Sequence, residues 1–170
     1  SEGGKELSLK VTAPFVSEAN LPVSVSAGQD KILGKVPSTM LYDSQYDLSL
    51  ELLDSQPVSK RAAPYPLNVK FFMKETGSKL SSVESLDVSS IGQLYTVTCK
   101  SPLDGLHFEA DRAKLDVWAV DKSKDNYVFS CSLNVNSLPA EGYEQSFINA
   151  KASYTIEKEF KTALIGSVNT

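Results

Sequence analysis

The sequence is poor in the residues that carry most catalytic and metal chemistry. Its 170 residues include one histidine, His107, two cysteines and one tryptophan. A nucleophile paired with an imidazole would have to use His107, whose surroundings read as a turn leading into a strand and predict a structural role. Zinc needs four ligands, usually in close pairs, and Cys99 and Cys131 are far apart. Glycine-flanked serine and phosphate-loop motifs are also absent. These absences predict a non-enzyme with no catalytic residues, no cofactor and no identifiable small-molecule substrate.

Charge and hydropathy narrow the class of partner. The formal net charge is −4, which offers no surplus of Lys and Arg to neutralise phosphates, so nucleic acid is not expected as a partner. No run approaches the roughly 20 apolar residues of a membrane-spanning helix.

The two cysteines are compatible with either a reducing or an oxidising cellular compartment. Cys99 and Cys131 lie in strand-like runs that could meet in one sandwich and form a disulfide. The chain has no Asn-x-Ser/Thr glycosylation acceptor, however, which favours a reducing compartment. We therefore expect two reduced, buried cysteines in a cytoplasmic or membrane-peripheral protein, with a disulfide and secretion as the alternative.

Short runs that alternate apolar and polar residues dominate the chain. This period of two is typical of half-buried strands. The runs cover residues 7–12, 21–26, 48–53, 69–73, 95–99, 115–119, 127–135 and 148–157. They predict an all-β protein that forms an antiparallel β-sandwich of about eight strands. A jelly roll is one topology that fits this prediction. We expect one domain over residues 6–165, a flexible N-terminal segment or linker at 1–5 and a tail at 166–170.

One serine-rich stretch, residues 80–91, breaks the alternation. Its apolar residues fit neither the period of a strand nor that of a helix. They are Leu80, Val83, Leu86, Val88 and Ile91. The pattern predicts a loop or a single helical turn.

The polar loop near residue 123 contains the best candidate metal ligands. Side-chain oxygens of Asp121, Asp125 and Asn126 could gather around Ca²⁺, which takes about six to eight oxygen ligands. Lys122 and Lys124 would partly cancel the charge of such a site. The interpretation is therefore an ordinary hairpin loop, with no metal expected and these three residues as weak candidates.

The same hairpin resembles the third calcium-binding loop of C2 domains. The resemblance rests on Val117-Trp118 before the loop, Asp121 within it and Tyr127-Val128 after it, and extends over residues 106–138. Ala119 stands where the first loop aspartate of that family belongs, and Phe129 replaces its glycine. The resemblance implies a C2-like sandwich that has lost calcium binding and works through protein or lipid surfaces.

Two functions follow from this combination. The first is a non-catalytic interaction module that binds a protein partner or a membrane surface. Lysines and one tyrosine are the candidate interaction residues, namely Lys70, Lys74, Lys122, Lys124 and Tyr127. The alternative is a self-assembling structural subunit, such as a viral coat, matrix or movement-type protein, built on the same strands.

Overall fold

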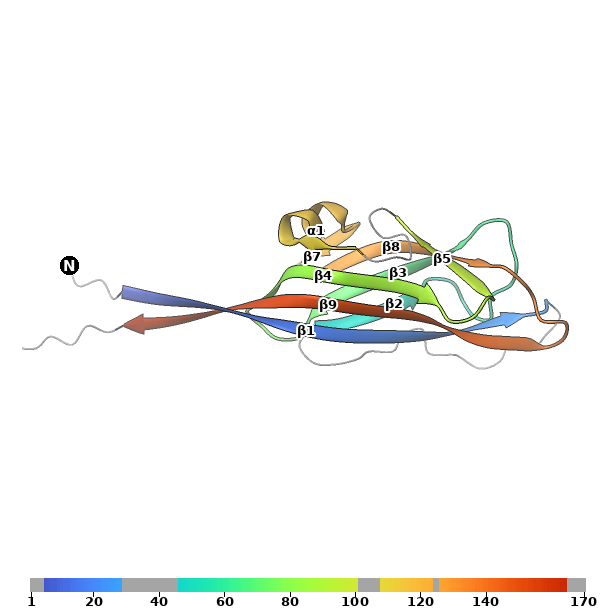
Figure 1. Cartoon of the computed structure of the whole chain (residues 1–170), viewed down its shortest axis with the longest axis horizontal. Helices are drawn as coiled ribbons and strands as arrows, with labels where there is room; N and C mark the ends of the chain where they lie inside the picture. The colour runs from blue at the N-terminus through green and yellow to red at the C-terminus, as the bar shows by residue number, and fades with distance from the viewer. Residues whose placement is uncertain (1–4, 29–45, 101–107, 124–125, 165–170) are drawn as a thin grey trace, which may run out of the picture.

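Two antiparallel sheets pack face to face and confirm the predicted all-β sandwich (Figure 1). The computed structural model describes residues 5–28, 46–100, 108–123 and 126–164. Within them, nine strands and one helix follow in the order β1 (Lys5–Ser26), β2 (Tyr46–Leu52), β3 (Tyr65–Met73), β4 (Ser78–Ser90), β5 (Tyr95–Cys99), β6 (Ala110–Asp111), α1 (Arg112–Trp118), β7 (Asp121–Ser123), β8 (Asn126–Val135) and β9 (Tyr143–Leu164). Sheet A has the strand order β1-β9-β4-β6, and sheet B has the order β2-β3-β8-β5 with β7 also paired to β8.

The core lies between the sheets because alternate residues of each strand point inward. In β8 the inward residues run regularly from Tyr127 through Phe129, Cys131 and Leu133, as the sequence predicts. Aromatic rings join the two layers. Phe71 of β3 packs edge to face on Tyr154 of β9, with ring centroids 5.8 Å apart.

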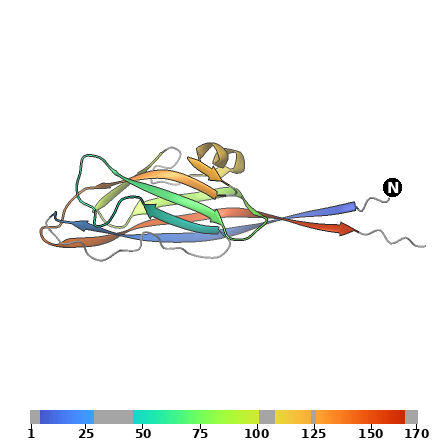
Figure 2. The ribbon, with the colours of Figure 1, turned by 180° about the vertical axis from the view of Figure 1, so that it is seen from behind.

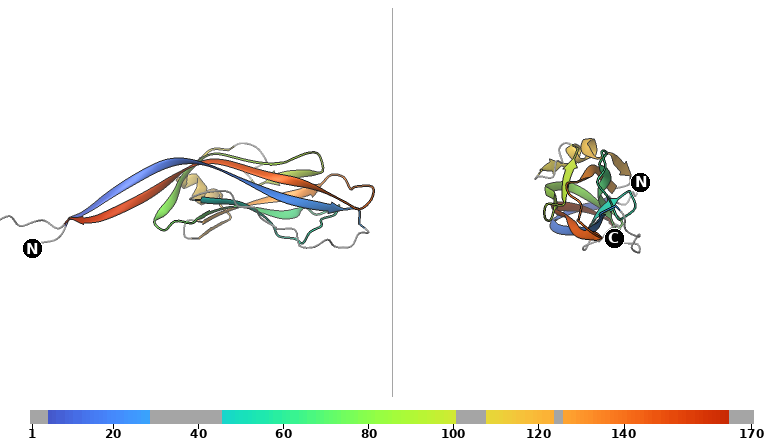
Figure 3. Two further views of the ribbon diagram at one scale, coloured as in Figure 1. Left: turned by 90° about the horizontal axis from the view of Figure 1, so that it is seen from below. Right: turned by 90° about the vertical axis from the view of Figure 1, so that its right-hand side faces the viewer.

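The strands β1 and β9 are much longer than the sandwich. They pair along all 22 residues of each strand, from Lys5 opposite Leu164 to Ser26 opposite Tyr143. The predicted runs 7–12 and 21–26 are therefore parts of one strand. The segments 5–10 of β1 and 159–164 of β9 lie past the last residue of β9 that pairs with β4, and they project beyond the other strands as a two-stranded ribbon (Figures 1–3). Lys5 belongs to β1; the rest of the predicted N-terminal segment and the predicted tail 166–170 lie outside the described residues.

The prediction of a loop or helical turn at 80–91 is wrong, because residues 78–90 form β4. Its pairing with β9 skips one residue between Leu80 and Ser82 and another between Val83 and Ser85. Each extra residue is a β-bulge, which lengthens the spacing of inward residues from two to three. Leu80, Val83 and Leu86 are buried for this reason despite their irregular spacing.

The predicted strand at 115–119 is also wrong, because residues 112–118 form α1. The side chain of Asp111 caps its first turn by accepting a hydrogen bond of 2.9 Å from the Lys114 amide. Leu115 is the buried residue of the helix, whereas Val117 is 79% exposed. The alternation of Leu115, Val117 and Ala119 predicted a strand, but these residues do not lie together on one buried face.

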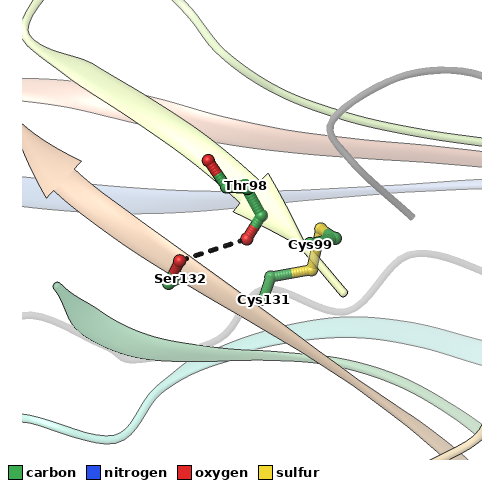
Figure 4. The surroundings of a disulfide bond; sticks show 4 residues. All are labelled: Thr98, Cys99, Cys131 and Ser132. Carbon is green, nitrogen blue, oxygen red and sulfur yellow. Dashed lines mark hydrogen bonds between the residues drawn. A yellow bond between two sulfur atoms is a disulfide. The ribbon is translucent and has the colours of Figure 1, made fainter. Parts of the chain in front are cut away.

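A disulfide joins Cys99 of β5 to Cys131 of β8, so the expectation of reduced cysteines is wrong. The two residues are direct cross-strand neighbours in sheet B. Figure 4 shows the bond beside the Ser132 hydroxyl, which donates a 3.2 Å hydrogen bond to the Thr98 carbonyl. The missing glycosylation acceptor could not reveal this pairing, because it carries no information about strand register.

Candidate interaction surfaces

A groove crosses the outer face of sheet B, on the side away from the core. Its volume is about 570 Å³. One row of cross-strand neighbours forms its floor, because Ser49 pairs with Lys70, Lys70 with Val128, and Val128 with Asp121. The described residues that line it are Ser49, Glu51, Lys70, Phe71, Phe72, Met73, Asp121, Ser123, Asn126 and Val128.

The groove combines apolar contacts with charges of both signs. Phe72, Met73 and Val128 supply partly exposed apolar surface. Lys70 forms an ion pair with Glu51 across β2 and β3. Asp121 adds a further carboxylate from β7. A ligand in this groove would meet charges of both signs around an apolar patch.

The structure brings some of the predicted site residues together. Lys70 and the metal candidates Asp121 and Asn126 all line the groove. Lys74 follows the end of β3 and is exposed. Lys124, Asp125 and His107 lie outside the described residues.

Tyr127 and Lys122 belong to a separate cluster with Asp116 of α1. The ring of Tyr127 is only 1% exposed, and its hydroxyl donates a 3.2 Å hydrogen bond to the Asp116 carboxylate. Lys122 forms an ion pair with the same carboxylate, and its Nζ lies 5.8 Å from the centre of the Tyr127 ring. The hydrogen bond from Lys122 is the main reason that the pKa of Asp116 is lowered. These contacts attach α1 to the β7–β8 hairpin. Sequence reasoning missed Asp116 because it placed this residue on a strand.

Two of the three candidate metal ligands, Asp121 and Asn126, lie within the described residues. Asp121 and Asn126 lie at the groove, and the described part of the chain holds no group of three or more His, Cys, Asp or Glu placed to bind a metal ion. The third candidate, Asp125, lies outside the described residues, so the expectation of no metal stays a prediction.

The projecting ribbon forms a second unusual surface. Residues of β1 and β9 that oppose each other share a face, so the inward face of the sandwich continues along the ribbon as an apolar strip. We define this strip as Leu7, Leu9, Val11 and Phe160. In the described part of the chain no strand of sheet B covers it, and Leu9 is 58% exposed and Phe160 47%. The alternation at 7–12 predicted this shared face but not its exposure.

No family model, curated protein or solved structure matches the chain. Among the described residues, α1 is too short and too polar to cross a membrane, and no other helix is present there.

Proposed function

We propose that the domain is a non-catalytic interaction module that binds a protein partner in the groove of sheet B. The observation that supports it is the groove itself. The exposed face of a sandwich sheet is usually polar and solvated, whereas here Phe72, Met73 and Val128 lie beside the Lys70–Glu51 ion pair and Asp121.

The lining fits a short polypeptide segment with an apolar side chain flanked by charged ones. Phe72 offers a rigid aromatic contact, and Met73 is a flexible side chain that adapts to different shapes. Asp121 could meet a positive charge on the segment, whereas Lys70 is paired with Glu51.

The same lining gives little support to a membrane surface as the ligand. Binding to anionic headgroups depends on clustered positive charge. Among the described residues of the lining, the one lysine is already paired with Glu51, and Asp121 adds a second negative charge. We therefore favour a protein partner over a membrane.

The Cys99–Cys131 bond favours an oxidising compartment for this interaction. Disulfides form and persist mainly in secreted, cell-surface and periplasmic proteins. We therefore propose that the partner is met outside the reducing cytosol.

A random peptide library displayed on phage would test the groove as the binding site. Peptides selected on the wild-type domain should bind Val128→Arg at least about tenfold more weakly, because the new side chain fills the groove and adds a charge. Asn134→Arg is the matched control, since Asn134 lies on the same strand β8 but outside the groove lining. Peptides should bind this control like the wild type.

Two results would count against the proposal. One is a library that yields no binders, or binders that are equally insensitive to both substitutions. The other is pelleting of the domain with vesicles containing phosphatidylserine that is abolished by Lys70→Glu, which would make a membrane the ligand of the groove.

A further inference from the structure

We infer that two copies of this chain pair through the projecting ribbon, with the β1 strands antiparallel and Ser8 on the two-fold axis. This pairing uses a different surface from the groove and does not depend on it. It would join the two ribbons into one four-stranded sheet in the order β9-β1-β1-β9.

The ribbon lies outside the sandwich, so pairing with a second copy would disrupt no packing in the core. Residues 5–12 of β1 are all exposed, as are residues 159–163 of β9. The apolar strip on one face consists of the side chains defined above, and the opposite face is polar and charged. An isolated two-stranded ribbon is only marginally stable in water, whereas additional strands stabilise it.

In the described residues, β1 is an edge strand of sheet A, and its outer edge is open for hydrogen bonding along the ribbon. The outward backbone groups belong to the even-numbered residues, as the partners at the other end of the strand show. There the Ser24 amide donates to the Gln56 side chain at 2.9 Å and the Ser24 carbonyl accepts from the Val58 amide at 2.8 Å. Pro14 and Pro22, which lack an amide hydrogen, also occupy even positions.

Protection of this edge is therefore uneven. Gln56 and Val58 cover the end of the edge that includes Pro22, and Pro14 interrupts the row of donors near the middle. Between Glu6 and Thr12, no hydrogen bond from the described residues reaches the outward backbone groups. Such an open edge is a ready template for another strand.

The charge pattern selects a copy of the same strand and one register. Glu6 and Lys10 lie on the outward side at equal distances from Ser8. An antiparallel pair centred on Ser8 places Glu6 opposite the second copy's Lys10 in both halves. Centring on Glu6 or on Lys10 would instead oppose two like charges, which destabilises a cross-strand pair.

Existing ion pairs extend this complementarity across four strands. Within one chain, Oε1 of Glu6 lies 3.8 Å from Nζ of Lys161, and Nζ of Lys10 lies 3.8 Å from Oε1 of Glu157. Pairing would therefore create a row of alternating sign on the polar face. On the other face, each Leu7 would lie beside the second copy's Leu9 and join the two apolar strips.

The size of the contact predicts a weak dimer. Pairing of residues 5–11 spans about 23 Å of strand, so the buried surface falls below the roughly 1,200 Å² of a standard interface. We expect dissociation constants in the range of about ten micromolar to one millimolar, measured by sedimentation equilibrium.

Disulfide trapping tests the register. Both native cysteines are bonded to each other, so an introduced cysteine is the only free thiol. Opposed hydrogen-bonded residues have Cα atoms about 5.5 Å apart, within reach of a disulfide. Ser8→Cys should therefore form a covalent dimer under mild oxidation.

Thr12→Cys should not, because the two Thr12 residues would be about 26 Å apart. Preferential trapping by Thr12→Cys, or by Lys161→Cys on the edge of β9, would overturn the inference.

Mixing two charge variants tests the complementarity. Glu6→Lys and Lys10→Glu should each weaken self-association about tenfold, because each creates like-charged cross-strand pairs. An equimolar mixture should recover dimers, since only the mixed pair opposes opposite charges. Changes within each chain are the same in pure and mixed samples, so they cannot produce this recovery. Because both side chains are exposed, the variants should keep the wild-type circular dichroism spectrum. A mixture no more dimeric than either variant alone, or a wild type that is monomeric at about 1 mM, would overturn the inference.

Discussion

The hydroxyl of Tyr95 donates a hydrogen bond of 2.7 Å to the carbonyl oxygen of Val23 and so connects β5 of sheet B to β1 of sheet A. Tyr95 is 2% exposed. Burial, with a smaller contribution from the nearby Glu144, raises the pKa of Tyr95 far above its ordinary value. The hydroxyl therefore stays protonated and remains a donor at every pH at which the protein is ordinarily studied.

Tyr95→Phe should lower the free energy of unfolding by about 1 kcal/mol, because it removes this hydrogen bond and keeps the ring in the core. Urea unfolding followed by circular dichroism measures the difference. Tyr143→Phe is the matched control, since Tyr143 is 48% exposed and should tolerate the change. Equal stability of Tyr95→Phe and the wild type would show that the bond between the sheets contributes nothing.

The disulfide should stabilise the fold mainly by restricting the unfolded chain. Cys99 and Cys131 are separated by 32 residues, and closing a loop of that length is worth about 3–4 kcal/mol in the chain-entropy account. The double variant Cys99→Ala/Cys131→Ala should lose about this much in urea unfolding. A reductant should lower the midpoint of the wild type and leave the double variant unchanged; a wild type insensitive to reductant would contradict the prediction.

Asp116 gives a prediction about pH. Its pKa is lowered chiefly by the hydrogen bond from Lys122, so the folded state binds the proton more weakly than the unfolded state does. The resulting stabilisation is present above the unfolded pKa and is lost as the pH falls through the folded pKa. Because Asp116 and Lys122 are each more than a third exposed, the effect on stability should be small.

Carboxyl NMR titration measures this shift directly. In the wild type the pKa of Asp116 should lie below the ordinary value for an aspartate, and in Lys122→Met it should rise. Lys114→Met is the control, because Lys114 lies near Trp118 and should leave the titration unchanged. A titration of Asp116 that is the same in the wild type and in Lys122→Met would rule out the ion pair as the cause.

The alternation of the sequence predicted the sandwich because most strands bury every second residue without interruption. It could not distinguish Leu9 from Leu133, although one lies on the open ribbon and the other in the core. A period of two shows which residues share a face, but coverage of that face depends on the second sheet. The sequence likewise pointed to some residues of the groove but did not predict the groove itself. Lys70 and Asp121 were singled out individually, and strand register brings them together across β3, β8 and β7.

The two failures of the pattern had different local causes. At α1 an N-terminal cap at Asp111 and one buried leucine were enough for a short helix. In β4 the pattern was present but interrupted. Without Ser81 and Glu84, the residues that the pairing with β9 skips, the sequence from Leu80 to Val88 alternates perfectly.

Deleting Ser81 should therefore be tolerated, because the remaining residues keep their faces and their partners on β9. We expect a change of a few degrees in the melting temperature, measured by calorimetry. Deleting Asp87 is the contrasting control. Asp87 pairs with Lys151 and lies between the buried residues Leu86 and Val88, so its loss would turn one of them outward. That exposure should cost about 1.5–3 kcal/mol or prevent folding. If the Ser81 deletion destabilised the protein as much as the Asp87 deletion, the bulge would be required for the fold of sheet A and would not be a removable insertion.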